Sequence, residues 1–188
     1  MNQQESVSDE ALIEAAQKGD KNAAACLYNR HIDRVNRICY RIVLDLSQVQ
    51  DCVQEVWLKV FRNLDRFRCR ESFATWLNTV TANTAIDYYR KWIRQGNRLN
   101  CDKIHKRVVA ADRTIDQQLD KVLIHQRVYE ALEEMSVNQR TALVLRYFED
   151  MPMAEIAQIL GCTEGTVRTH IRRSLLALRA KLAGKIDI

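Results

Sequence analysis

Three groups of side chains in this 188-residue sequence have the residue types and spacing needed to bind a charged partner. The first is acidic: Asp51, Gln54 and Glu55 recur at intervals of three and four, so they share one face of a helix. Paired carboxylates can also serve acid–base catalysis. That chemistry needs a cleft and shifted pKa values, and no histidine or metal-spaced ligand accompanies them. We interpret this face either as a solvated surface or as a docking face for a basic partner.

The second group is basic and lies between residues 59 and 98, a stretch that holds nine basic and three acidic residues. A basic strip beside aromatic side chains suits a nucleic-acid backbone and exposed bases, although a solvated helix face can have the same composition. The candidate contacts are Arg66, Arg68 and Arg70 in a short break, and Arg90, Lys91 and Arg94 in the helix that follows.

The third group belongs to residues 152–168, whose pattern is typical of a helix-turn-helix. Ala157 is small enough to let two helices approach, Gly161 supplies the sharp turn, and Thr163 is a good N-cap for the second helix. On a helical wheel the apolar face of that helix holds Val167, Ile171, Leu175, Leu178 and Leu182.

The opposite face of the same helix is basic. It carries Arg168, Thr169 and Arg172, with Arg173 on its flank. Such a face can enter the major groove, where arginine reads guanine and contacts phosphates. The alternative is a helical hairpin with a solvated basic face.

The elements that must position these groups are all helical, because apolar residues recur at intervals of three and four and no strand alternation is present. Polar residues suited to cap helices are Ser8, Asp20, Ser47, Ser72 and Ser136. The helix after Ser47 is expected to bury Val49, Val53, Val56, Trp57, Val60, Phe61 and Leu64, and the helix after Ser72 to end near Gln95. The apolar period fails from residue 96 to residue 118, which we interpret as a flexible linker. The predicted fold is therefore all-α, with helical domains at 1–95 and 119–188.

Composition limits the class of protein. The net charge of +5 favours polyanionic partners, and 47% hydrophobic with 28% charged residues is typical of a globular protein. No signal peptide and no apolar run of roughly 18 residues is present, so we expect a cytoplasmic protein without membrane insertion. The six cysteines form no Cys-x-x-Cys pair, and we expect buried free thiols rather than a metal site or a cofactor.

The order of the motifs resembles the extracytoplasmic-function, or group-four, sigma factors of the sigma-70 family. Asp-x-x-Gln-Glu is followed by Phe-x-x-Trp-Leu-x-x-Val-x-x-Asn from Phe73 to Asn83, then by Asp-x-x-Arg-Lys and the helix-turn-helix. The resemblance covers nearly the whole chain apart from the linker. It implies an alternative sigma factor that binds core RNA polymerase, directs promoter-specific initiation and is not an enzyme.

The resemblance also implies a role for each group of residues. Asp51, Gln54 and Glu55 would dock on the clamp helices of the polymerase β′ subunit, and the β subunit would be a further contact. The −10 promoter element would be bound and opened by Arg66, Arg68, Arg70, Asn83, Arg90, Lys91 and Arg94. The −35 element would be read by Thr166, Arg168, Thr169, Arg172 and Arg173. An anti-sigma factor would be the regulatory partner.

One departure from the family pattern lies in the loop from Arg66 to Glu71, where Cys69 stands between two arginines in place of glycine or small polar residues. The preferred −10 base therefore does not follow from the resemblance. Two alternatives remain open at this point. One is a helix-turn-helix regulator with an effector-sensing N-terminal domain. The other is a cysteine-based sensor using Cys69, Cys101 or His105, although two ligands do not make a structural zinc site.

Overall fold

The computed structural model describes residues 7–68, 71–96 and 127–183, and within these ranges every regular element is a helix. The first part contains α1 (Asp9–Gln17), α2 (Lys21–Val43), α3 (Leu46–Asn63), the short 3₁₀ helix η1 (Leu64–Arg66) and α4 (Phe73–Arg94). The second contains helical residues 127–134, then α7 (Val137–Tyr147), α8 (Met153–Leu160) and α9 (Glu164–Leu182). The predicted all-α fold class is confirmed. The predicted linker, 96–118, lies almost wholly outside the described residues, so the domain boundaries stay a prediction.

Most helices begin where a capping side chain was predicted. The side chains of Ser8, Asp20, Ser72, Ser136 and Thr163 each accept a hydrogen bond from a backbone N–H in the first turn of the following helix. These bonds satisfy donors that a helix start otherwise leaves unpaired. The sequence pattern therefore located five helix starts through one physical requirement.

The start of α3 was predicted wrongly. Its N-cap is Asp45, whose carboxylate accepts both the backbone N–H of Ser47, at 2.9 Å, and the Ser47 hydroxyl, at 2.6 Å. The preceding residue, Leu44, ends α2 in the left-handed conformation with φ 59°. A two-residue connection therefore reverses the chain between α2 and α3.

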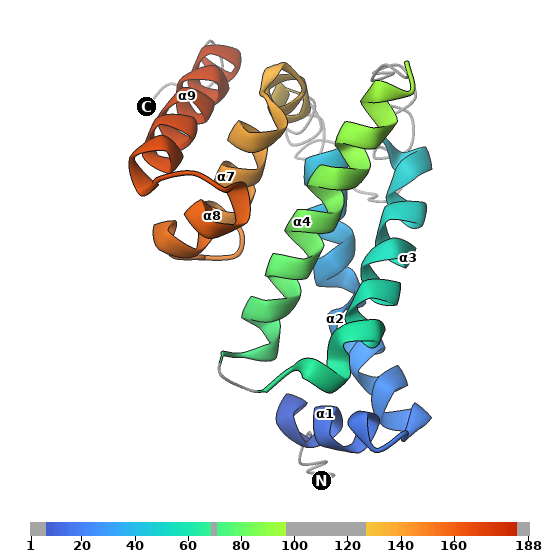
Figure 1. Ribbon diagram of the computed structural model, residues 1–188. Helices are drawn as coiled ribbons and strands as arrows, with labels where there is room; N and C mark the ends of the chain where they lie inside the picture. Colours follow the sequence, from blue (N-terminus) through green and yellow to red (C-terminus); the bar gives the residue numbers. More distant parts are fainter. Residues whose placement is uncertain (1–6, 69–70, 97–126, 184–188) are drawn as a thin grey trace, which may run out of the picture.

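Helices α2, α3 and α4 lie side by side as a bundle, and α1 crosses one end of it (Figure 1). The bundle buries Val53, Val56 and Trp57 of α3 as predicted. Phe61 was also expected to be buried, but its side chain is 39% exposed. The reason is that Phe61 lies at the edge of the buried stripe, where its ring packs against Trp57 at 5.5 Å between centroids.

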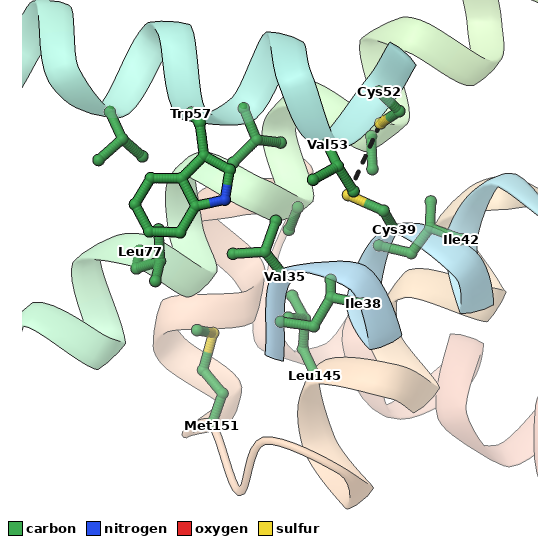
Figure 2. Close-up of a cluster of buried hydrophobic side chains, with 14 of the residues drawn as sticks. Val35, Ile38, Cys39, Ile42, Cys52, Val53, Trp57, Leu77, Leu145 and Met151 are labelled. Carbon is green, nitrogen blue, oxygen red and sulfur yellow. Dashed lines mark hydrogen bonds between the residues drawn. The ribbon is translucent and has the colours of Figure 1, made fainter. Parts of the chain in front are cut away.

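The two parts of the chain share one hydrophobic core. Helix α7 packs against α2 and α4, α8 packs against α4, and Figure 2 shows Leu145 and Met151 beside Val35 and Ile38 of α2. A second buried cluster places Leu44 against Ala131, Leu132, Met135 and Leu143. We call this packing of residues 127–183 against α2 and α4 the closed arrangement. The sequence pattern did not predict it.

The turn of the helix-turn-helix gives a test of the local fold. Gly161 has φ 63°, a conformation that strains a residue with a side chain, although a Cβ there would meet no atom within 4 Å. We expect Gly161→Ala to lower the free energy of unfolding by about 1 kcal/mol. Gly165, in the first turn of α9, should give the opposite sign, since Gly165→Ala removes part of the roughly 1 kcal/mol that glycine costs in a helix. Urea denaturation of both variants measures the difference, and an equal effect of the two changes would contradict the assigned turn.

Candidate nucleic-acid interface

The predicted acidic face lies on the solvent side of α3. Asp51 and Gln54 are exposed and Glu55 is partly exposed, whereas Cys52 and Val56 point into the bundle. The only ion pair recorded for these three residues within the described chain joins Glu55 to Lys59, with 3.4 Å between oxygen and nitrogen. Pairs this exposed contribute little stability, so both carboxylates stay available to a partner.

The basic break after α3 is held in place by backbone contacts. The Gln17 side chain of α1 donates to the Leu64 and Phe67 carbonyls at 2.8 and 3.1 Å, which fixes η1 on the end of the bundle. Arg66 and Arg68 are exposed, and Arg68 donates to the Asp65 carbonyl at 2.8 Å. The predicted contact Arg70 and the neighbouring Cys69 lie outside the described residues.

Beneath the break lies an aromatic cluster from two segments. The ring centroid of Phe67 is 5.1 Å from that of Trp76 and 5.9 Å from that of Phe73. Phe67 and Phe73 are buried, so the cluster connects the break to the start of α4. It supports the basic residues rather than presenting free rings to solvent.

The remaining −10 candidates lie along one face of α4. Asn83, Arg90, Lys91 and Arg94 are all exposed, at helical intervals of seven, one and three residues. Asp87 shares this face and reduces its positive charge by one. Opposite them α4 buries Asn78, Thr81 and Ala85 against the bundle. The structure thus brings these four predicted residues together on one surface.

The helix-turn-helix has the predicted internal geometry. Gly161 closes α8 in the left-handed conformation, and its N–H donates to the Gln158 carbonyl at 3.3 Å. Ile156 and Val167 are fully buried between the two helices, and Ala157 is also buried. The geometry fixes the direction in which α9 leaves the turn.

The basic face of α9 points to solvent. Arg168, Arg172 and Arg173 are exposed, as is Thr169, while Thr166 is half-buried beside the Thr163 hydroxyl. Among the described residues Arg168 pairs with exposed Glu164 at 3.4 Å, and Thr169 donates to the Gly165 carbonyl of its own helix. The arginines are therefore free to meet a polyanion.

The apolar face of α9 differs from the wheel. Leu175 is 41% exposed, whereas Ser174 is fully buried along with Val167, and the Ser174 hydroxyl donates toward the Gln139 and His170 carbonyls at 3.1 and 2.9 Å. A small residue at this position lets α9 approach α7 closely. Exposed Leu175 and Leu176 instead line a shallow groove of about 320 Å³ with Met153 and Ile171. Burial and the nearby positive charge of Arg173 both lower the pKa of His170.

Two further features of the described residues concern a metal site and a membrane span. Among the described residues no three His, Cys, Asp or Glu side chains lie close enough to hold a metal ion. The pair Cys101 and His105 falls outside those residues. No helix in the described ranges is both long enough and apolar enough to cross a membrane.

Polar contacts reinforce the closed arrangement, and sequence reasoning missed them. Arg34 of α2 pairs with Glu149 of the α7–α8 connection at 2.6 Å, and the Glu149 side chain is only 4% exposed. The guanidinium of Arg41 lies 3.9 Å from the centroid of the neighbouring Phe148 ring. Arg90, one of the −10 candidates, donates to Asn138 at the start of α7 at 3.1 Å.

A buried cation also lies at this contact. Arg140 of α7 is fully buried, donates to the Leu132 carbonyl at 3.2 Å and has its guanidinium 4.6 Å from the centroid of the Tyr89 ring of α4. Burial lowers the pKa of Arg140, an effect opposed by Tyr89 and Glu133. Its Nε and Nη2 have no hydrogen-bond partner of good geometry in the described structure. The closed arrangement therefore carries an electrostatic cost.

Taken together, a basic helical bundle and a helix-turn-helix with an exposed basic recognition face define a helical DNA-binding protein. The sequence matches the family described as "Sigma-70 region 2" over residues 27–94 and "Sigma-70, region 4" over residues 125–178. It is 32% identical to the ECF RNA polymerase sigma-E factor of Escherichia coli K12 over 184 residues, 95% of this chain and 96% of that protein. The ECF RNA polymerase sigma-E factor of Haemophilus influenzae is 30% identical over 95% of this chain and 97% of that protein. SigW of Bacillus subtilis is 27% identical, with 90% and 94% covered.

The chain belongs to the extracytoplasmic-function sigma factors. Its function is that of an alternative sigma factor in transcription initiation. The region 2 match falls where the rival regulator would have its effector-sensing domain, so that rival is not favoured.

Solved structures share the fold. CnrH in complex with the cytosolic domain of CnrY aligns with a TM-score of 0.63 at 22% identity, covering 95% of this chain and 99% of that one. The sigma factor RpoE in complex with the anti-sigma factor NepR, from Bartonella quintana, aligns with a TM-score of 0.61 at 18% identity. This alignment covers 85% of this chain and 96% of that one. Both alignments extend over the two parts of the chain.

The Arg34–Glu149 pair tests the closed arrangement in solution. We expect a double-mutant cycle with Arg34→Gln and Glu149→Gln to give a coupling of about 1–2 kcal/mol in urea unfolding, because a hydrogen bond between charged and largely buried groups is lost. The exposed pair Arg168–Glu164 is the control, with an expected coupling below about 0.5 kcal/mol. A coupling near zero for Arg34 and Glu149 would mean that the two parts do not pack together in solution.

Proposed function

We propose that the α3 face of Asp51, Gln54 and Glu55 docks this sigma factor on the β′ clamp helices of core RNA polymerase. The observation that carries the proposal is the arrangement of α3: its acidic side chains face solvent with one weak ion pair, while its other side is fixed in the bundle core. A basic partner surface would meet a preformed row of carboxylates. Complementary charges of this kind set orientation and encounter rate.

The two basic faces serve the promoter in this proposal. Arg66, Arg68, Arg70 and the α4 row of Asn83, Arg90, Lys91 and Arg94 bind the −10 element, where cations on one face suit the phosphates of DNA. Thr166, Arg168, Thr169, Arg172 and Arg173 of α9 contact the −35 element in the major groove. Residues 1–95 and 119–188 act as the two promoter-binding domains, and 96–118 link them.

Promoter binding requires the closed arrangement to open. Elements at −35 and −10 are separated by about 25 base pairs, or about 85 Å of duplex at about 3.4 Å per base pair. In the closed arrangement α9 lies on the outer side of α7, which packs on α4 (Figure 1). Two helix-to-helix steps of about 8–10 Å put the axes of α4 and α9 at most about 20 Å apart, far less than this length of duplex. In the closed arrangement one donor nitrogen of Arg90 is also taken up by Asn138.

Further partners complete the proposal. The exposed leucines of the α9 groove suit the β subunit, and an anti-sigma factor is the regulatory partner. The second of these is supported by the solved complex of the related fold with the anti-sigma factor NepR. We place the protein in the cytoplasm with polymerase, as a binding subunit without catalytic residues of its own.

Charge reversal tests the docking face. We expect Asp51→Lys with Glu55→Lys to weaken binding to purified core polymerase by about 10-fold or more, since like charges then oppose each other. Helical content should not change, because both positions face solvent. The matched control is Glu10→Lys with Glu14→Lys, an exposed acidic pair at the same spacing on α1, which should bind as the wild type does. Equal affinity of both double variants would remove this face from the interface.

Base reading by α9 is tested in the reconstituted holoenzyme. If Arg168 or Arg172 forms a bidentate contact with guanine, its replacement by Ala should cost about 1–3 kcal/mol and relax preference at one position of the −35 element. A phosphate contact would lower affinity evenly across sequences. The control is Arg37→Ala, which removes an exposed cation on α2 and should change neither the affinity nor the base preference. The readout is a binding-selection profile on a promoter library, and unchanged profiles for both variants would reject α9 as the reader.

A further inference from the structure

Two buried thiols face each other inside the N-terminal bundle. The Sγ atoms of Cys39 on α2 and Cys52 on α3 are 3.7 Å apart, and both side chains are fully buried (Figure 2). Of the other described cysteines, Cys26 is exposed and Cys162 is half-buried. Neither the acidic face nor the basic faces use this pair.

The helix geometry allows a covalent bond between the two thiols. Helix axes pack about 8–10 Å apart and Cα atoms lie about 2.3 Å from the axis, so Cα atoms that face each other across a contact are about 3.4–5.4 Å apart. A disulfide spans Cα separations of roughly 4.4–6.8 Å. Cys39 and Cys52 also lie close to the two-residue connection between α2 and α3, where the enclosed chain is short.

We propose that Cys39 and Cys52 are an oxidisable dithiol, which peroxide converts to an intramolecular disulfide that ties α2 to α3. One sulfur, as thiolate, attacks the peroxide O–O bond, which breaks, and hydroxide leaves and takes up a proton to form water. The resulting sulfenic acid is attacked by the second thiol. The S–O bond then breaks, and the departing oxygen leaves as water with the proton of that thiol. Both cysteines are oxidised and one peroxide is reduced to two waters.

Burial makes this reaction conformationally gated. The nearby Cys52 thiol and desolvation raise the pKa of Cys39, so little thiolate exists while α2 and α3 are packed together. Reaction therefore waits for a local separation of α2 and α3 near their connection, and then competes with reclosure. The rate of disulfide formation should become independent of peroxide concentration when peroxide is abundant. Exposed Cys26 should react in proportion to peroxide throughout.

The test uses the wild-type full chain with hydrogen peroxide, followed by alkylation and tryptic mapping. Trypsin cuts after Arg37, Arg41 and Lys59, which places the cysteines in separate peptides, 38–41 and 42–59. We expect these two peptides to become joined, with the loss of two hydrogens, as the main disulfide of the folded protein. Dithiothreitol should release them. The oxidised protein should also unfold at a higher urea concentration, because the link restricts the unfolded chain.

Two comparisons decide the outcome. The same treatment in denaturing urea should give mixed pairings among the six cysteines, and an equal yield of the 39–52 link there would show that the fold does not direct it. Cys39→Ala should abolish the joined peptide while leaving the helical content unchanged. If Cys39→Ala does not fold, Cys52→Ala is used in its place. The proposal is overturned if Cys26 is fully oxidised in the folded wild type and no 39–52 link forms. None of these readouts depends on polymerase or DNA.

Discussion

The structure depends on the apolar packing of α2, which is shared by both parts of the chain. One side of this helix buries Val35, Ile38 and Cys39 among α3 and α4, and the same stretch meets Leu145 and Met151 from the second part. Apolar burial of this kind is the main favourable term in folding, and it has no fixed direction. The packing of the second part on α2 therefore rests on buried apolar area rather than on directional bonds, and separating the two parts would expose that area to water.

Electrostatics adjusts this apolar contact in both directions. Arg34 with Glu149 and Arg41 over Phe148 favour the closed arrangement. The buried Arg140 opposes it, because two of its nitrogens lack hydrogen-bond partners of good geometry within the described ranges. A buried ion pair gives little net stability once desolvation is counted. These charged groups therefore determine which surfaces of the two parts come into contact. They contribute little to the free energy of that contact. Arg90 belongs both to this contact and to the proposed −10 surface, so its bond to Asn138 competes with DNA for one of its donor nitrogens.

Local chemistry made much of the fold predictable, and long-range packing accounts for what was not predicted. Ser72, Ser136 and Thr163 were identified as caps because capping is a matter of a few neighbouring residues, and the basic face of α9 followed from helical periodicity. Asp45 displaced Ser47 because a carboxylate two residues earlier was a better acceptor. Leu175 proved exposed, because the partner of α9 is α7, which a wheel of α9 alone does not contain. Residues 115 apart in sequence, such as Arg34 and Glu149, leave no periodic signal at all.

Leu44 connects the backbone between α2 and α3 to the packing of the second part of the chain. Its backbone ends α2 in the left-handed conformation, at a cost of about 1–2 kcal/mol for a residue with a side chain. Its side chain is buried against Leu132, Met135 and Leu143 of the second part, and that burial offsets the strain only while the two parts are packed together. Opening therefore leaves a strained residue at the base of α3, the helix that carries the acidic face. By thermodynamic reciprocity, a partner that bound better to a relaxed connection between α2 and α3 would weaken the contact with α7, and opening that contact would raise the affinity for that partner by the same factor.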